Sequence, residues 1–280
     1  MNDERRFSVS FLKPDHLKAF AALPNAFTSK VIRAYVSSDL LLDDAEALRI
    51  CENLSGKMPW TEWILALPEI LRSKEESYFQ EVDALMAKHE LFAGVLTGSM
   101  EGLGYYAEKN IKVYGDHNLY LWNSHSVKAL GGILSGGCLP LELKGAEQRD
   151  LLKLPIIWDK IIYGRIPMMV TANCVAKTTD RCRKGNQKEQ QVVLLDRMDK
   201  SFPVRLVCRH CHNVIYNCLP LSLHKELDKY QDKTCFRLQF TVEDRTHTER
   251  VLTFFLQADT RDLEPPYAEY TTGHEKRGVQ

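Results

Sequence analysis

Glu75–Glu90 (EESYFQEVDALMAKHE) and Phe92–Leu96 (FAGVL) are the two segments that decide the fold class. Apolar residues in the first recur at the three- and four-residue spacing of a helix, and the second is a short apolar run typical of a buried strand. The same alternation of helix and strand continues over the first 170 residues. Other strands are expected at Phe7–Phe11, Val31–Val36, Trp63–Leu67, Ile111–Tyr114, Cys138–Leu143 and Ile156–Tyr163.

Helical patterns lie between these strands, and several begin with the Asp or Ser that favours a helix N-cap. They cover Asp15–Leu23, Asp43–Leu54, Ser124–Leu130 and Lys144–Leu152. About seven consecutive strand–helix units predict a parallel sheet, either a barrel or a doubly wound sheet. No G-x-G-x-x-G motif follows the first strand, so we favour an α/β fold with a TIM-like, possibly irregular, barrel.

The pattern changes after residue 190, where short strands joined by polar turns are expected at Val192–Leu195, Val204–Val207 and Val214–Tyr216. Phe236–Val242 and Val251–Leu256 alternate in the manner of a hairpin. We therefore expect a barrel over residues 1–190 and a small β-rich extension over 191–262. An extended C-terminal arm is expected over 263–280, which contains little apolar sequence.

Composition places the chain among ordinary globular proteins, with 44% apolar and 26% charged residues. Disordered, collagenous and coiled-coil classes are excluded. No apolar run approaches the length of a membrane helix, and the first residues lack the apolar core of a secretory signal. We therefore expect no membrane partner and a cytoplasmic location.

The 37 basic and 37 acidic residues balance over the whole chain but not locally. Residues 160–225 contain twelve Lys or Arg and four Asp or Glu, an excess of +8. Such a basic third of the chain could meet a phosphate-rich partner such as RNA. An ordinary solvated surface is the other interpretation.

The strongest chemical signal is the spacing Cys174-x7-Cys182-x25-Cys208-x2-Cys211. A C-x2-C pair brings two thiolates to one ion from a tight turn, and a second pair would complete a four-thiolate shell. Four soft thiolates select an iron–sulfur cluster or zinc. His210 or His212 could replace a thiolate, and unrelated buried cysteines are the structural alternative. The other four cysteines are expected in the core or without a role.

Several polar groups follow predicted strands, where the active sites of such barrels lie. Asp116 with His117 could act as a general base, or these residues could simply fix a turn. Glu142 is either a carboxylate at the barrel mouth or a charge at a helix start. Arg165 could bind a carboxylate or form a surface ion pair. Asn123 could equally be a helix cap.

The C-terminal residues Tyr270–Gln280 carry an unusual density of polar groups for a frayed terminus. We expect this segment to dock on the protein, over the barrel mouth, with a disordered end as the alternative.

Three stretches resemble the peptidase U32, or collagenase-like peptidase, family. They are Tyr163–Cys174 (YGRIPMMVTANC), Leu195–Arg197 with Phe202–Val204, and Cys208–Cys211 with Ile215–Asn217 and Pro220–Leu223. The closing Tyr270–Val279 (YTTGHEKRGV) is similar to that family's C-terminal signature. The resemblance runs from about residue 90 to the end and implies a TIM-type barrel with a small β extension.

The resemblance also implies functions. Several members of the family hydroxylate transfer RNA or ribosomal RNA, or take part in quinone hydroxylation, with a cysteine-held iron–sulfur cluster. The cysteines of those RNA-acting members are arranged differently from the present set, which is similar to the C-terminal module of longer, two-barrel members. A companion barrel domain or subunit is therefore an expected partner.

Together these observations predict a 4Fe–4S enzyme of the RNA-hydroxylation type, with zinc as the alternative metal. The expected catalytic residues are Asp116 and Glu142, which would orient the substrate, and Arg165, which would hold a small carboxylate cosubstrate. The expected substrate-binding residues are Asn118, Asn123, Tyr163, His274, Lys276 and Arg277. Two other functions stay open: a collagenase-like peptidase, for which the sequence offers no nucleophile or catalytic-metal motif, and a non-catalytic module with structural zinc.

Overall fold

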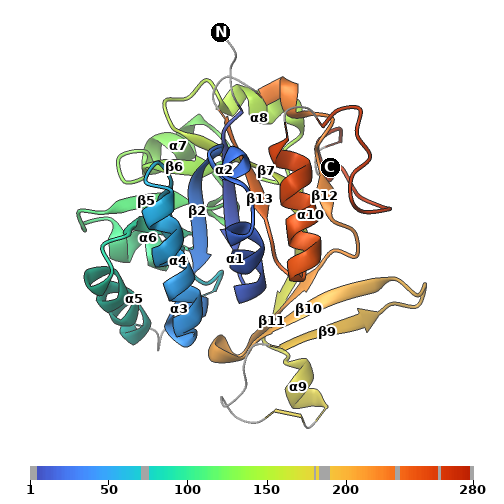
Figure 1. The fold of residues 1–280 in the computed structure, drawn as a ribbon, viewed down its shortest axis with the longest axis horizontal. Helices are drawn as coiled ribbons and strands as arrows, with labels where there is room; N and C mark the ends of the chain where they lie inside the picture. Colours follow the sequence, from blue (N-terminus) through green and yellow to red (C-terminus); the bar gives the residue numbers. More distant parts are fainter. Residues whose placement is uncertain are drawn as a thin grey trace.

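Eight parallel strands close into a barrel in the order β1-β2-β3-β4-β5-β6-β7-β13, and β13 pairs again with β1 (Figure 1). The computed structural model describes residues 5–70, 76–179, 181–182, 190–230, 234–257 and 260–277. The predicted TIM-like barrel is confirmed. The strands are β1 (Phe7–Phe11), β2 (Val31–Ser37), β3 (Glu62–Ala66), β4 (Phe92–Thr97), β5 (Lys112–Gly115), β6 (Gly136–Cys138), β7 (Trp158–Gly164) and β13 (Thr234–Gln239).

Helices surround the barrel and bury an apolar core between themselves and the strands (Figure 1). They are α1 (Pro14–Ala21), α2 (Asn25–Thr28), α3 (Ser38–Asp43), α4 (Ala45–Lys57), α5 (Glu76–Lys88), α6 (Met100–Tyr106), α7 (Ser124–Leu130), α8 (Gly145–Leu151) and α10 (Arg245–Leu256). Side-chain caps start several of them. Asp44 accepts hydrogen bonds from two backbone N–H groups of α4, and Ser99 and Asp244 cap α6 and α10 in the same way.

The lumen of the barrel is partly polar, and two arginines converge there on the buried Asp159 of β7. Asp159 Oδ1 accepts from Arg33 Nη1 at 3.0 Å, and Oδ2 accepts from Arg237 Nη2 at 2.8 Å and from the Tyr35 hydroxyl at 2.7 Å. The guanidinium of Arg33 lies 4.2 Å from the ring centre of Tyr114, and that of Arg237 lies 4.3 Å from the ring centre of Tyr35. Paired charges and stacked rings therefore fill the middle of the barrel.

This lumen network reaches both ends of the barrel. Arg33 Nε also meets Glu62 Oε2, at the start of β3, at 3.3 Å. Arg237 Nη1 donates to Asp116 Oδ1, just after β5, at 2.6 Å. Because parallel strands all end on the same side, the second contact lies at the carboxyl end of the barrel, called the mouth below.

A four-stranded antiparallel sheet is inserted between β7 and β13 and lies against the mouth. This capping sheet has the order β8-β11-β10-β9 and consists of β8 (Pro167–Thr171), β9 (Gln190–Leu195), β10 (Ser201–Val207) and β11 (His212–Tyr216). Alternate residues of β10 and β11 share a cavity with the strand ends of the barrel, namely Arg205, Val207, His212, Val214 and Tyr216. In Figure 1 the β9–β10 hairpin projects away from the barrel.

The residues expected as a second hairpin belong to the barrel instead. Phe236 to Gln239 lie in β13, the strand that closes the barrel, and Val251 to Leu256 lie in α10. The hairpin prediction is therefore wrong, and residues 191–262 do not form one β-rich unit. The insertion that separates β7 from β13 contains the capping sheet, the short strand β12 (Leu221–Ser222) and the 3-10 helix η3 (Leu227–Tyr230).

The predicted C-terminal arm, of which residues 263–277 are described, docks on the outer flank of β7 rather than over the mouth. Strand β12 pairs with the end of β7, and Thr271 forms a parallel bridge with Leu221 of β12. Farther along, Glu275 Oε2 pairs with Lys160 Nζ at 3.0 Å, and both side chains are 4% exposed. Glu275 Oε1 accepts from the Tyr230 hydroxyl at 2.7 Å. The arm thus fills the seam that the short strand β6 leaves beside β7.

In the described part of the chain, no helix combines the length and apolar character that crossing a bilayer requires.

Replacing Asp159 with alanine is expected to destabilise the fold by about 3–5 kcal/mol, because two buried guanidinium groups lose their common partner. Urea unfolding followed by circular dichroism measures the change. The matched variant Asp150→Ala removes a carboxylate that is 73% exposed and should leave the unfolding midpoint unchanged. Equal midpoints for the two variants would show that the lumen network contributes nothing to stability.

Candidate functional site

The mouth of the barrel collects ionisable side chains from three strand ends and from the capping sheet. Asp39 follows β2, Glu69 follows β3 and Asp116 follows β5, while Arg205 and Tyr216 come from the capping sheet. They line one cavity of about 60 Å³. That volume suits a few water molecules or one end of a larger ligand. We call it the mouth cavity.

Asp116 and His117 form the pair that the sequence suggested as a general base. His117 Nδ1 lies 3.2 Å from Asp116 Oδ1, which also accepts from the His117 backbone N–H at 2.8 Å. Burial alone would lower the pKa of His117, but the adjacent carboxylate raises it above its usual value. Burial would raise the pKa of Asp116, but Arg237 and His117 hold it well below its usual range. The pair therefore favours an ionised carboxylate beside an imidazolium.

Glu69 is a mouth residue that the sequence analysis missed. Its Oε2 atom is buried and makes no hydrogen bond within the described residues. Burial raises the pKa of this carboxyl group, against the lowering effect of Arg205 and His117. An acid with a raised pKa beside a carboxylate with a lowered one is the arrangement that divides general acid from general base. The signal in the sequence was weak, a single Pro-Glu after the strand Glu62–Ala66.

A groove of about 410 Å³ adjoins the mouth cavity and shares Leu12, Asp39, Arg205 and Thr241 with it. It runs between the capping sheet and the rim of the barrel and forms an entrance. Carboxylates dominate its charged lining, which consists of Lys13, Asp15, Asp39, Asp43, Asp44 and Arg205. The route to the mouth cavity is therefore predominantly acidic.

The four predicted ligand cysteines gather on the outer side of the capping sheet, next to the rim. Cys208 and Cys211 lie in the turn between β10 and β11, and Cys174 precedes the short helix α9 (Val175–Thr178). Cys174 and Cys208 pack on the same apolar cluster, and Asn213 Nδ2 donates to the Asn173 carbonyl at 2.9 Å, which ties β11 to the segment before α9. Burial, and then the nearby Cys174, Cys182 and Cys211, raise the pKa of the Cys208 thiol.

This donor set suits a soft metal ion or an iron–sulfur cluster in its chemistry. The thiols are neighbours, but within the described ranges no three Cys, His, Asp or Glu side chains are grouped closely enough to hold a metal ion. The eight cysteines include no disulfide.

The histidines beside Cys211 have other roles in this structure. His210 Nε2 lies 3.1 Å from both carboxylate oxygens of Asp39, and its ring packs edge-on against Tyr78. The hydrogen bond from His210 lowers the pKa of Asp39 although burial would raise it. Arg209 pairs with Asp43 at 2.7 Å. These contacts fasten the cysteine turn to the rim of the mouth.

Glu142, Arg165 and Tyr163 lie outside the mouth cavity. Glu142 is in the loop after β6, with a buried Oε2 atom that has no hydrogen bond in the described part of the chain. Arg165 Nη1 donates to the Asn217 carbonyl at 2.9 Å and also to the Cys218 carbonyl, so its donors hold the connection from β11 to β12. Tyr163 faces outward from β7 and meets Glu243 Oε1 at 3.1 Å.

The remaining expected substrate-binding residues are also separate from the mouth cavity. Asn123 accepts hydrogen bonds from two backbone N–H groups of α7 and is the N-cap of this helix. This is the helix-cap role that the sequence left open as the alternative to substrate binding. Asn118 lies in the 3-10 helix η1 (His117–Leu119) against Gly98. His274 lines the seam beside β7, and Lys276 and Arg277 are exposed on the arm.

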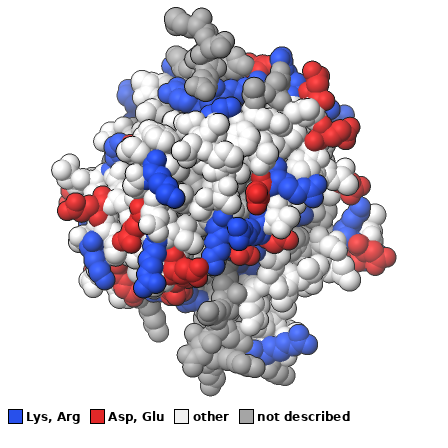
Figure 2. All heavy atoms as spheres, viewed as in Figure 1, with Lys and Arg blue, Asp and Glu red and all other residues white. Residues whose placement is uncertain are grey.

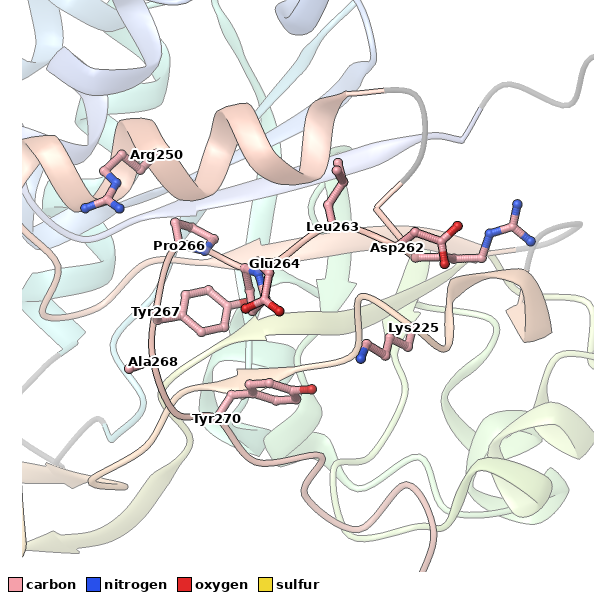
Figure 3. Close-up of a pocket in the computed structure, with 11 residues that line it drawn as sticks. Lys225, Arg250, Asp262, Leu263, Glu264, Pro266, Tyr267, Ala268 and Tyr270 are labelled. Atoms are coloured by element: carbon pink, nitrogen blue, oxygen red, sulfur yellow. The ribbon is translucent and has the colours of Figure 1, made fainter.

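A different hollow, of about 570 Å³, lies where the arm arches beside α10. Figure 3 shows Tyr267 and Tyr270 of the arm and Lys225 and Arg250 from the protein body around it. None of the residues predicted from the sequence as site residues lines it.

Three of the twelve basic residues in 160–225 pair with other groups inside the protein or at the rim of the barrel. Lys160, Arg165 and Arg209 make the buried or rim contacts described above. On the face shown in Figure 2, basic and acidic side chains are interspersed. The exposed basic residues of this region include Lys177, Arg197, Lys200 and Lys225.

Solved structures that are similar to this chain include an uncharacterised B. cereus protein and a U32 peptidase. The B. cereus protein matches with a TM-score of 0.45 and 11% identity, covering 92% of this chain and 66% of that one. The U32 peptidase matches with a TM-score of 0.45 and 9% identity, covering 86% of this chain and 94% of that one. No protein-family model and no curated protein matches the chain. The chain spans about two thirds of the B. cereus protein, and neither match is close enough to assign an activity.

Replacing Asp116 with asparagine is expected to lower the pKa of His117 below about 6.5, because burial then acts without the opposing carboxylate. In the unchanged protein the His117 pKa is raised, so stability from this pair is present below about pH 6.5 and is lost as pH rises through the folded pKa. An NMR titration measures the pKa of the His117 imidazole in the unchanged protein and in Asp116→Asn. Asp150→Asn serves as the control and should leave the His117 titration unchanged; an unshifted His117 in Asp116→Asn would refute the pairing.

Proposed function

We propose that this chain is an enzyme that works at the capped mouth of its barrel, with a cysteine-held metal centre at the rim. The observation that carries the proposal is one turn, Cys208–Cys211, which supplies two of the four cysteines and is fastened through His210 to Asp39 of the mouth cavity. Metal centre and cavity would then be neighbours. A 4Fe–4S cluster would supply one-electron chemistry there, whereas zinc would serve as a structural cross-link.

The protein's own residues would carry the acid–base work. Asp116 stays ionised and holds the His117 imidazole in place, and Arg237 fixes the carboxylate from the lumen. Glu69 is the group able to give up a proton inside the cavity, since burial favours its neutral form. The capping sheet limits the access of water to these groups, which strengthens their electrostatic effect.

Metal binding is tested by anaerobic purification with analysis of iron, sulfide and zinc. We expect brown protein with a broad visible absorption band and about four irons per chain. Both the band and the iron should be lost in Cys208→Ser. Cys218→Ser is the matched control, because Cys218 lies outside the set of four. Colourless protein with one equivalent of zinc would support the structural module instead, and metal-free protein would reject the centre altogether.

RNA is the substrate class that we propose for a hydroxylation-type reaction. The proposal rests on the family resemblance and on the exposed basic side chains of the capping sheet. Arg197 and Lys200 lie in the β9–β10 turn, where Asp196 accepts from the Met198 and Lys200 backbone N–H groups and orders the turn. That turn presents the two basic residues to solvent on the projecting hairpin.

Fluorescence anisotropy with a labelled tRNA-sized hairpin tests this substrate class. Affinity should fall as salt rises, and the slope of log K against log salt should shrink by about 0.7 for each of Arg197→Ala and Lys200→Ala. Lys153→Ala removes an exposed lysine just after α8, at the end of the molecule away from the β9–β10 hairpin (Figure 1), and should leave the slope unchanged. Salt-independent binding, or equal slopes in all variants, would argue against RNA at this hairpin.

Hydrolysis of peptides is the second candidate function. The acid–base arrangement of Asp116, His117 and Glu69 favours it, because together these groups could activate water and protonate a leaving group. Digestion of denatured collagen that disappears in Asp116→Asn would support this function over RNA modification.

A further inference from the structure

We propose that the mouth cavity binds a primary ammonium group, carried by a lysine side chain or by a free amine. The inference deepens the proposed function, because it assigns a ligand class to the same mouth, but it does not require a metal.

The first observation is a set of buried polar atoms that line this one cavity without hydrogen bonds. They are Ser10 Oγ, Glu69 Oε2 and Gln239 Oε1, none of which has a hydrogen-bond partner in the described residues. Ser10 is 8% exposed. Buried polar groups in native proteins are almost always hydrogen-bonded, so three such atoms around one space indicate a missing polar guest.

The three atoms come from separate parts of the fold. Ser10 lies on β1, Glu69 follows β3 and Gln239 ends β13. Only closure of the barrel brings them to the same cavity. The set is therefore a product of the assembled fold and not of one irregular loop.

The chemistry of these atoms favours a guest that donates hydrogen bonds. The amide oxygen of Gln239 can only accept, an ionised Glu69 can only accept, and the Ser10 hydroxyl can accept as well as donate. An ammonium group offers three N–H donors and no acceptor. An anion would offer no donor to Gln239 or to the Glu69 carboxylate.

The charges around the cavity agree with a cation. Asp15, Asp43 and Asp44 line the entrance groove, and a negative lining concentrates cations near it. Arg205 lines both spaces, but its charge acts on two carboxyl groups: it contributes to the lowered pKa of Asp39, and it opposes the burial that raises the pKa of Glu69. An ammonium group beside Glu69 would favour the ionised carboxylate that burial now disfavours.

The dimensions also fit one end of a chain-like ligand. About 60 Å³ accommodates an aminomethyl group, and the 410 Å³ groove can hold the rest of the molecule. Leu12 lines both spaces and offers an apolar contact for the methylene groups of such a ligand.

The test compares three probes of matched length by isothermal titration calorimetry at low salt: butylamine, butanol and butyrate. We expect saturable binding of butylamine, at least tenfold weaker binding of butanol and no binding of butyrate. Tightest binding of butyrate would identify an anion site governed by Arg205 and overturn the proposal, as would equal binding of all three probes.

Variants locate the site. Glu69→Gln should weaken butylamine binding at least tenfold, and Ser10→Ala should weaken it less. Glu101→Gln changes an exposed glutamate at the start of α6 and should bind like the unchanged protein. Butylamine binding that survives Glu69→Gln in full would overturn the assignment, and the three-probe comparison needs no variant to fold.

Two more measurements distinguish a lysine side chain from a free amine as the ligand, and the ammonium site from the proposed metal-dependent function. Tighter binding of N-acetyl-lysine methylamide than of butylamine would point to a lysine in a polypeptide, and the reverse to a free amine. Butylamine binding that persists in Cys208→Ser, the variant expected to lose the metal, would support the inference independently of the metal. Unchanged protein that is purified without metal and still binds butylamine would reject the proposed metal centre and keep this inference.

Discussion

The contact on which the rest of the structure depends is the pairing of Asp159 with Arg33 and Arg237 in the barrel lumen. Two guanidinium groups placed together in a protein interior repel each other unless a carboxylate lies between them. Asp159 supplies that carboxylate and links strands β2, β7 and β13. Arg237, held in this way, then reaches Asp116 at the mouth. Stability of the barrel and alignment of the candidate site thus rest on the same side chains.

The two faces of the capping sheet have different roles, because successive side chains of a strand point to opposite faces. On β10 and β11, one set of side chains faces the mouth cavity, and the next set builds the apolar cluster on which Cys174 and Cys208 pack. A metal centre on one face would therefore be mechanically coupled to the ceiling of the cavity on the other face. His210, between Cys208 and Cys211, anchors this ceiling to Asp39.

The sequence predicted the barrel because helical and strand periodicities alternate clearly over its first 170 residues. It failed at residues 251–256, because Val251, Thr253 and Phe255 alternate like a strand although Val251, Leu252 and Phe255 share the buried face of α10. For the site, Asp116 and His117 could be predicted from their position after a strand. Glu69 could not, because only the closed barrel shows that its carboxyl group is buried.

The long insertion between β7 and β13 has a consequence for the order in which the protein can form. The last strand of the barrel emerges from the ribosome some 70 residues after its neighbour, so the first seven strands wait as an open sheet with two bare edges. Such edges attract other chains during that interval. For a nascent polypeptide of this design, chaperones or early docking of the inserted sheet would limit such pairing until Gln239 has left the ribosome.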